Sequence, residues 1–221
     1  MYMIREILPN ISAKQIAVSM SKPFRFFLDE EQNVRQRSHA LFGRMLHHAE
    51  LVALCGGDSR KTDMTVGTVQ AGLYLEYRHV SSDCVGSCLI YREADTRLAL
   101  INEHVRFLRR NRIEREKFQW FTRQKNACES LGISAIHITG ARSSISEGYY
   151  FYPLFGFNAS LPQEFIRFLP DELSPCQTLL SLYEHFSGRK IWFRYGYPCD
   201  MVFELHGGFN QSQRTYEQYK K

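Results

Sequence analysis

The stretch RLALINEHVRFLRRNRIEREKFQWFTRQKNACESLGISAIHITGA, residues Arg97 to Ala141, decides the fold. Its first part alternates apolar and polar side chains, which is typical of a strand. Glu114 to Gly132 carries apolar residues at helical spacing, and glycine is a common residue just after a helix. The β-branched run Ile133 to Ala141 is typical of a buried strand. Strand, helix and strand in this order predict a right-handed βαβ unit with parallel strands.

The segments before this unit predict an antiparallel sheet. Val66–Val80, Cys84–Glu93 and Arg97–Leu108 have the period of strands, and short polar turns separate them. Such neighbours usually pair antiparallel, so we expect a three-stranded meander. Asp29–Cys55 has helical spacing and acidic residues at its start, which predicts one helix that ends at Gly56.

The tail completes the expected architecture. Cys176–Gly188 predicts a helix, and Arg189–Gly208 is rich in rings and β-branched residues, which predicts closing strands. The fold class is therefore α+β, a mixed sheet flanked by helices. At 221 residues one domain is expected, with an N-terminal helical part (1–57), a core (58–160) and a C-terminal helix with closing strands (161–221).

Composition excludes several classes of protein. The chain is 44% hydrophobic and has no apolar run near the roughly 20 residues of a membrane helix, so no membrane partner is expected. Arg5 and Glu6 stand where a secretory signal would be apolar, which favours a cytoplasmic protein, acting in its own cell or delivered into another one. The six cysteines are scattered, which predicts reduced thiols and no structural metal.

Charge is concentrated in one place. VRFLRRNRIEREK, Val105 to Lys117, holds six basic residues and two acidic ones, in a chain whose net charge is +5. A local excess of this kind could hold phosphate groups, and it could equally be the solvated start of a helix.

The order of these motifs resembles the GCN5-related N-acetyltransferase (GNAT) superfamily over roughly Gly72 to Asn158. The resemblance rests on Val105-x4-Arg110, a helix, the sequence ACESLGISAIHITGA, and a tyrosine-rich turn that ends at Gly156-Phe157. It implies a mixed sheet that binds acetyl-CoA as cosubstrate. It also implies transfer of an acyl group to a primary amine on a small molecule or a protein.

The resemblance places the cofactor at the start of the predicted helix. Members of the family have Arg/Gln-x-x-Gly-x-Gly/Ala there, and its backbone amides hold the CoA pyrophosphate. Counted from Val105, both glycine positions carry side chains in this chain, so arginine guanidinium groups would have to replace amide contacts. The implied cofactor-binding residues are Val105, Phe107, Arg110, Arg112, Ile113 and Arg115.

Amine acylation needs a base for the amine and an acid for the leaving thiolate. Members of the family often take the base from a central strand, which implies Glu103, with Glu76 as a weaker candidate. The acid is frequently a tyrosine four residues before the Gly of a Gly-Phe pair, which is Tyr152 here, and Tyr149 and Tyr150 offer further hydroxyls. A carboxylate on a strand is also common in an ion pair, and a tyrosine ring is also common in a hydrophobic core.

Other functions fit the sequence as well. A GNAT-like fold that has lost CoA binding could serve as an interaction module for an acidic partner, and the missing glycines favour that interpretation. A cysteine nucleophile, one of Cys84, Cys88 or Cys128 with His104 or His137, is weaker because the thiols fall at core positions. No recognisable signature of nucleic-acid binding is present.

Overall fold

The computed structural model describes residues 25–26, 30–58, 61–69, 72–80, 84–94, 96–107, 113–143, 146–206 and 210–220. The strands in these residues are β1 (Arg25–Phe26), β2 (Thr62–Val69), β3 (Gly72–His79), β4 (Cys84–Arg92), β5 (Leu98–Phe107), β6 (Ile133–Gly140), β7 (Arg142–Ser143), β8 (Ser146–Glu147) and β9 (Cys199–Glu204). The helices are α1 (Glu31–Phe42), α2 (His48–Leu54), α3 (Ile113–Ser130), α4 (Gly148–Leu154), α5 (Gln163–Ile166), the 3-10 turn η2 (Asp171–Leu173), α6 (Leu179–Tyr183), α7 (Phe186–Tyr195) and α8 (Gln211–Lys220).

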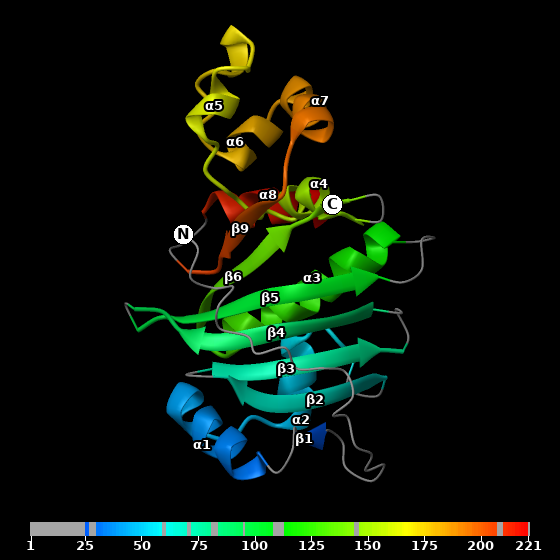
Figure 1. Ribbon diagram of the computed structural model, residues 1–221, viewed down its shortest axis with the longest axis vertical. Coiled ribbons are helices and arrows are strands. Elements are labelled where there is room, and N and C mark those ends of the chain that lie inside the picture. The colour runs from blue at the N-terminus through cyan, green and yellow to red at the C-terminus, as the bar shows by residue number, and fades with distance from the viewer. Residues whose placement is uncertain are drawn as a thin grey trace.

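The described strands form one seven-stranded mixed sheet in the order β1-β2-β3-β4-β5-β6-β9, and β7 and β8 form a separate small hairpin (Figure 1). The mixed sheet with flanking helices confirms the α+β class that the sequence predicts. β2 to β5 pair antiparallel in succession, β5 and β6 are parallel, and β9 is antiparallel to β6.

The prediction of a three-stranded meander is wrong, because the meander has four strands. The segment from Val66 to Val80 contains parts of two strands, because Val66–Val69 of β2 pairs antiparallel with Gly72–Leu75 of β3. β2 also begins at Thr62, inside a stretch whose polar residues favour a loop.

The βαβ prediction is confirmed. α3 connects β5 to β6, and the two strands pair in parallel from Leu98–Ile133 to Asn102–Ile138. The helix ends where Gly132 adopts a φ of +72°, a conformation that glycine reaches at low cost.

The single helix predicted over Asp29–Cys55 is wrong, because α1 and α2 are separate. α1 ends at Gly43, whose φ is +71°, and α2 begins after His47. Two side-chain contacts fix the bend: the Ser38 hydroxyl donates to the carbonyl of Arg44, and the amide of Leu46 donates to the Ser38 hydroxyl.

The prediction of several closing strands is also wrong. Arg189 to Tyr195 belongs to α7, β9 is the one strand among the described residues of this segment, and the polar residues Gln211–Lys220 form α8. Because Trp192 is fully buried, packing overrides the strand preference of its neighbours. The predicted helix over Cys176–Gly188 is split into α6 and the start of α7.

α5, η2, α6 and α7 project beyond the end of the sheet as a lobe (Figure 1). The chain leaves the sheet after Asn158 and returns in β9 at Val202. The backbones of these two residues exchange hydrogen bonds of 2.8 Å in both directions.

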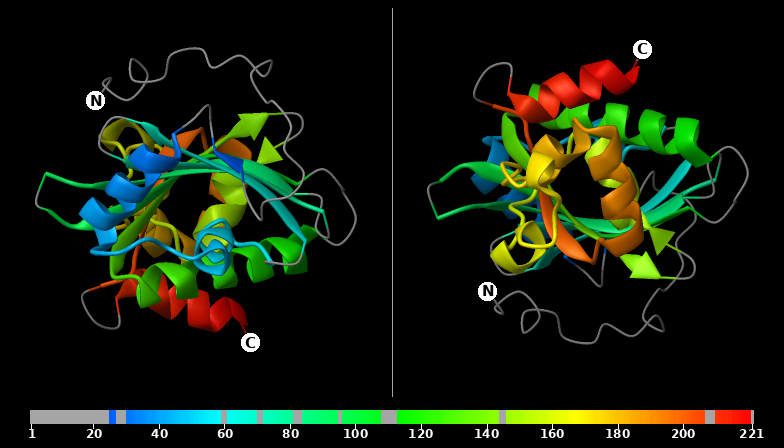
Figure 2. Two further views of the ribbon diagram at one scale, coloured as in Figure 1. Left: turned by 90° about the horizontal axis from the view of Figure 1, so that it is seen from below. Right: turned by 90° about the horizontal axis from the view of Figure 1, so that it is seen from above.

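The main core lies between the sheet and the helices α2 and α3, and Figure 2 shows α2, α3 and α8 on one face of the sheet. Buried residues of α1 belong to the same core. Three side chains of α3 bind the carboxyl end of α2. Trp120 Nε1 donates to the carbonyl of Cys55 at 2.8 Å, Arg123 Nε to that of Gly56 at 2.8 Å, and Gln124 Nε2 to that of Leu54 at 2.7 Å. α3 therefore satisfies carbonyls that a helix end leaves without partners.

Candidate active site

The parallel strands β5 and β6 separate halfway along β5. The last pair between β5 and β6 in the described residues is Asn102 with Ile138, whereas β5 continues against β4 as far as Phe107 with Cys84. The second half of β5 therefore presents one backbone edge that no described strand covers. Buried N–H and C=O groups require hydrogen-bond partners, so this edge suits an extended ligand that carries amides.

A β-bulge lies where the strands separate. Ser87 of β4 pairs with His104, and the next residue, Cys88, pairs with Asn102, so Glu103 is the extra residue. A bulge bends its strand and changes the direction of the side chains in it. Burial raises the pKa of the Glu103 carboxyl group above its ordinary value. A carboxylate with a raised pKa accepts a proton more readily, as a general base must.

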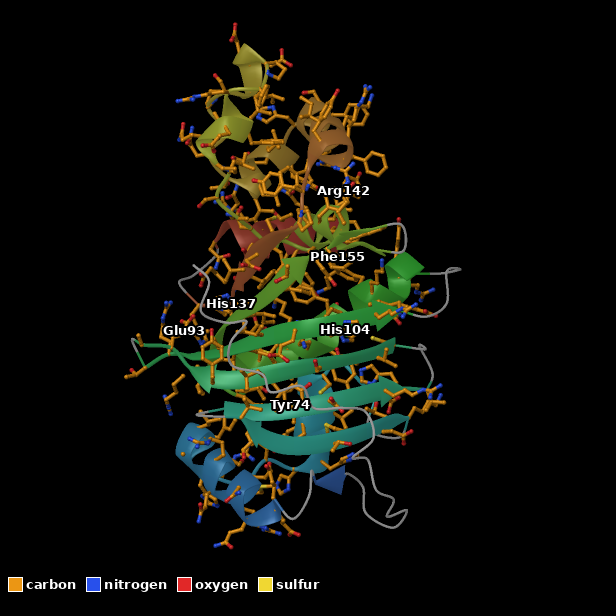
Figure 3. The ribbon with its side chains drawn as sticks, viewed as in Figure 1. Tyr74, Glu93, His104, His137, Arg142 and Phe155 are labelled. Atoms are coloured by element: carbon orange, nitrogen blue, oxygen red, sulfur yellow. The ribbon has the colours of Figure 1, made fainter. Side chains whose placement is uncertain are left out.

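A row of polar side chains crosses the sheet face opposite α2 and α3 and ends at His104, the neighbour of Glu103. Thr65, Glu76, Ser87 and His104 stand side by side across β2 to β5, as the strand registers show. All four line a hollow of ≈ 490 Å³, and Figure 3 labels His104 on β5. These side chains give this face of the sheet groups that can form hydrogen bonds with a polar substrate.

Tyr74 connects this row to Glu103. Its hydroxyl donates to Glu76 Oε1 at 3.2 Å and hydrogen-bonds Ser87. Burial is the main cause that raises the pKa of Tyr74 to about 12; the hydrogen bond from Ser87 opposes the shift, and the carboxylates of Glu76 and Glu103 add to it. The predicted base and the weaker candidate therefore lie around one tyrosine.

Tyr152 lies on the other side of the sheet from this cluster. Its ring rests on Gly148, where an added Cβ would be 2.9 Å from Tyr152 Cε2. Its hydroxyl lies near the buried thiol of Cys84 and the buried hydroxyl of Tyr77. Burial raises the pKa of Tyr152, so the phenol stays protonated and can donate.

The Tyr77 hydroxyl is buried and has no hydrogen-bond partner among the described residues. An added Cβ at Gly86 would lie 2.5 Å from the Tyr77 oxygen, so the hydroxyl occupies the space that a larger residue would fill. A buried hydroxyl without a partner is costly and is often explained by a ligand or a water molecule. Tyr77 and Tyr152 thus bring two hydroxyl groups to the helix-covered side of the sheet.

The implied cofactor residues fall into three groups. Val105 pairs with Gly86, and Phe107 makes an edge-to-face contact with Trp120 at 5.9 Å between ring centroids. Ile113 is the first residue of α3 and Arg115 is exposed in its first turn. Arg110 and Arg112 lie outside the described residues.

Lys117 of α3 lies close to aromatic rings of α4 and β5. Its Nζ lies 4.0 Å from the ring centroid of Phe151 in α4 and 5.9 Å from that of Phe107 in β5. Sequence reasoning found Lys117 only as part of a basic run and missed Tyr74, Tyr77 and Ser87, which look like ordinary strand residues. The alternation of the strands could have placed Tyr74 and Glu76 on one face, but not the bulge.

The cysteines do not form a nucleophilic site in this arrangement. Burial raises the pKa of Cys84 to about 12 and raises that of Cys128 well above its ordinary value. Thiols of this kind are poor nucleophiles at neutral pH. The Cys55 and Cys88 sulfur atoms are 3.9 Å apart, and all six cysteines are free.

Within the described residues, no three His, Cys, Asp or Glu side chains are grouped as metal ligands. None of the described helices has the length and apolar character needed to cross a membrane. No protein-family model matches the chain, and no curated protein matches it significantly.

Proposed function

We propose that the protein is an acyl-CoA-dependent N-acyltransferase, with acetyl-CoA as cosubstrate, that acylates a primary amine by direct attack on the thioester. The observation that carries the proposal is the separation of β5 and β6 next to the bulged Glu103. It brings an uncovered backbone edge and a basic carboxylate to the same point of the sheet.

The edge of β5 gives the thioester arm a place to bind. The pantetheine part of CoA is extended and carries amide groups, so it can hydrogen-bond the free edge as an added strand would. The acyl group then reaches the point where the strands separate, between Glu103 on one face and Tyr152 on the other.

In the reaction, Glu103 takes a proton from the ammonium form of the amine, directly or through one water molecule. The free lone pair attacks the thioester carbon, and the resulting tetrahedral adduct collapses with loss of the thiolate. Tyr152 donates its phenolic proton to that sulfur, and the proton that the new amide loses restores the phenol. The products are the N-acylated amine and CoA thiol, without a covalent enzyme intermediate.

The phosphates of CoA would bind near the start of α3, where Arg115 is exposed and Arg110 and Arg112 are close in sequence. Glu114 and Glu116 in the first turn of this helix oppose an anion there, so arginine charges must outweigh theirs.

The absent loop glycines favour a second candidate function, an inactive GNAT-like module that binds an acidic partner. One measurement separates the two. A ligand that binds only the folded state raises the melting temperature, so acetyl-CoA in large excess should raise Tm by several degrees if the enzyme proposal is right. An unchanged Tm at ~1 mM acetyl-CoA would reject the enzyme and leave the module.

The chemistry is tested with Glu103→Gln, which keeps the size of the side chain and removes the base. We expect turnover of a broad amine panel to fall by about 10²–10⁴-fold while the Tm shift with acetyl-CoA is retained. Glu164→Gln, the same chemical change at an exposed position of α5 outside the hollow, is the control and should leave turnover unchanged. Equal loss in both variants would remove Glu103 from the mechanism.

The raised pKa of Glu103 also predicts the pH dependence of the rate. The base acts only when deprotonated, so the acid limb of the kcat/KM profile should lie above the pH range of an ordinary glutamate. Tyr152→Phe should lower kcat without moving that limb. A limb that moves with Tyr152→Phe would assign the titration to another group.

A further inference from the structure

A second pocket lies away from the separated strands, between the start of α4 and one face of α7. It has a volume of ≈ 780 Å³ and is lined by four cationic side chains and four aromatic rings, with no acidic side chain from the described residues. Figure 3 labels Arg142 at this place, between the sheet and the lobe. Glu103 and Tyr152 do not line it, whereas Tyr149 and Tyr150, the further candidate hydroxyls of the sequence, do.

The floor of the pocket is fixed by hydrogen bonds between α4 and α7. The Tyr149 hydroxyl donates to the carbonyl of Phe193 at 2.8 Å, and Trp192 Nε1 donates to the carbonyl of Tyr149 at 2.9 Å. The guanidinium group of Arg142 donates to the carbonyls of Gly196 and Arg194 and lies over the Tyr149 ring, 5.2 Å from its centroid. The pocket is therefore preorganised, which lowers the entropic cost of binding a ligand.

α7 presents one face to the pocket. Phe186, Arg189, Lys190 and Phe193 follow the helical spacing i, i+3, i+4 and i+7, so they share that face. The carbonyl of Tyr183 accepts from Arg189 Nε at 2.6 Å, and Lys190 Nζ lies 4.3 Å from the Phe186 ring centroid. Arginine keeps its charge in proteins, so like charges are held close together, and an anion in the pocket would relieve their repulsion.

The aromatic rings that line the pocket narrow the class of anion that can bind in it. Phe186 is 73% exposed and Phe193 is 51% exposed, although burying a large ring is favourable. Tyr150 meets Phe193 edge-to-face at 5.0 Å, which leaves ring surface turned to the pocket. A flat ring can stack on such surface, while a phosphate meets the guanidinium groups beside it.

We propose that this pocket, lined by Arg142, Tyr150, Phe186, Arg189, Lys190 and Phe193, binds a nucleoside phosphate. The rings hold the base and the cations hold the phosphate. The ligand is either a free nucleotide or the end of a single strand, because both present the same base and phosphate. The volume suits a ligand of this size.

The test is isothermal titration calorimetry of the full-length protein with AMP, adenosine, inorganic phosphate and a short single-stranded oligonucleotide. We expect AMP to bind at least about tenfold more tightly than adenosine or phosphate, because it engages both rings and cations. Tighter binding of the oligonucleotide, with the same sensitivity to the variants below, identifies a strand end as the ligand. No AMP binding at ~1 mM, or phosphate binding as tightly as AMP, overturns the proposal.

Two exposed substitutions locate the site without disturbing the fold. Lys190→Glu and Phe186→Ala should each weaken AMP binding by about tenfold, and higher salt should weaken it further. The matched controls are Arg167→Glu and Phe168→Ala, which are exposed residues of the same lobe outside the pocket. Equal binding by all four variants would place AMP elsewhere and overturn the assignment.

CoA contains an adenine nucleotide, so the test must also distinguish this pocket from the proposed phosphate site of CoA near the start of α3. Arg115→Glu, at an exposed position there, should leave AMP affinity unchanged. AMP binding that Arg115→Glu abolishes, while Lys190→Glu does not, would mean that the nucleotide occupies the CoA site and would overturn the assignment.

Discussion

Gly156, beside the predicted acid Tyr152, is a position where one methyl group has a large cost. Its φ is +96°, and an added Cβ would lie 2.2 Å from the backbone oxygen of Ser212 in α8. The Gly-Phe pair that marked this stretch in the sequence therefore allows close contact between α4 and α8.

We predict that Gly156→Ala lowers the free energy of unfolding by about 3 kcal/mol or more, from backbone strain and the clash together. Gly132→Ala is the matched control, because Gly132 also has a positive φ but no atom within 4 Å of the added Cβ. Its cost should be only about 1 kcal/mol. Urea unfolding measures both, and equal costs would show that α8 moves away to make room.

His79 makes the stability of the fold depend on pH. Its Nδ1 lies 2.8 Å from Thr62 Oγ1, its Nε2 lies 2.8 Å from the carbonyl oxygen of Cys55, and burial lowers its pKa to about 4. The unfolded chain binds a proton near pH 6.5, whereas the folded chain does not until pH 4. Stability is therefore complete above pH 6.5 and is lost as the pH falls towards 4.

We predict a loss of about 2 kcal/mol between pH 7.5 and pH 5 from this residue, measured by urea unfolding at both values. His79→Phe removes the titrating ring and should reduce that difference by the same amount. An unchanged difference would assign the pH dependence to carboxylates.

At the scale of elements, a buried amide pair joins β5, α3 and α2. Asn102 Nδ2 donates to Gln124 Oε1 at 2.8 Å, Gln124 Nε2 donates to Asn102 Oδ1 at 3.0 Å, and Gln124 also binds the carbonyl of Leu54. The pair fixes α3 against the last residue of β5 that pairs with β6.

We predict that Gln124→Leu destabilises the protein by about 2–4 kcal/mol, because it leaves the Asn102 amide and the Leu54 carbonyl buried without partners. Gln119→Ala, on the exposed face of the same helix, should change the free energy of unfolding by no more than about 0.5 kcal/mol. Thermal unfolding followed by circular dichroism distinguishes the two. A small effect at Gln124 would mean that water replaces the lost contacts.

Sequence patterns predict correctly those elements in which apolar residues repeat at a regular spacing without interruption. α3 and β6 meet that condition, and their prediction is confirmed. α8 is polar apart from two tyrosines, so its pattern gives no helical stripe, and the rings of α7 favour a strand until Trp192 is seen to be buried. Composition of a segment does not reveal which neighbours it will pack against.

The candidate site follows the same rule. The strand that carries Glu103 is predictable from alternation, and so is the helix start near Arg115. The bulge is not, because it depends on which residues of β4 and β5 pair, a property of two strands together. The partners of Tyr74 and the position of Lys117 depend on the same long-range register.

At the scale of the whole molecule, the C-terminal helix closes the core. Tyr216 is 2% exposed, stacks on Phe118 at 5.2 Å between ring centroids, and contacts Phe203 of β9. Its hydroxyl donates to Thr122 Oγ1 at 2.9 Å, across 94 residues of sequence. The last element of the chain therefore binds the central helix.

We predict that Tyr216→Ala lowers the free energy of unfolding by about 3–5 kcal/mol, as is usual for a large buried ring. Tyr219→Ala, which removes a partly exposed ring from the same helix, should cost clearly less. Differential scanning calorimetry compares them. Equal losses would indicate that α8 detaches as a unit in both variants.

The backbone hydrogen bonds between Asn158 and Val202 have a consequence for how this protein can change over evolution. Because the chain leaves and re-enters the sheet through two backbones that bond each other, the segment between them starts and ends at one place. Its length can grow, shrink or be exchanged without shifting the register of β6 and β9. Recombination within the lobe could therefore change what the protein binds and leave the sheet unchanged.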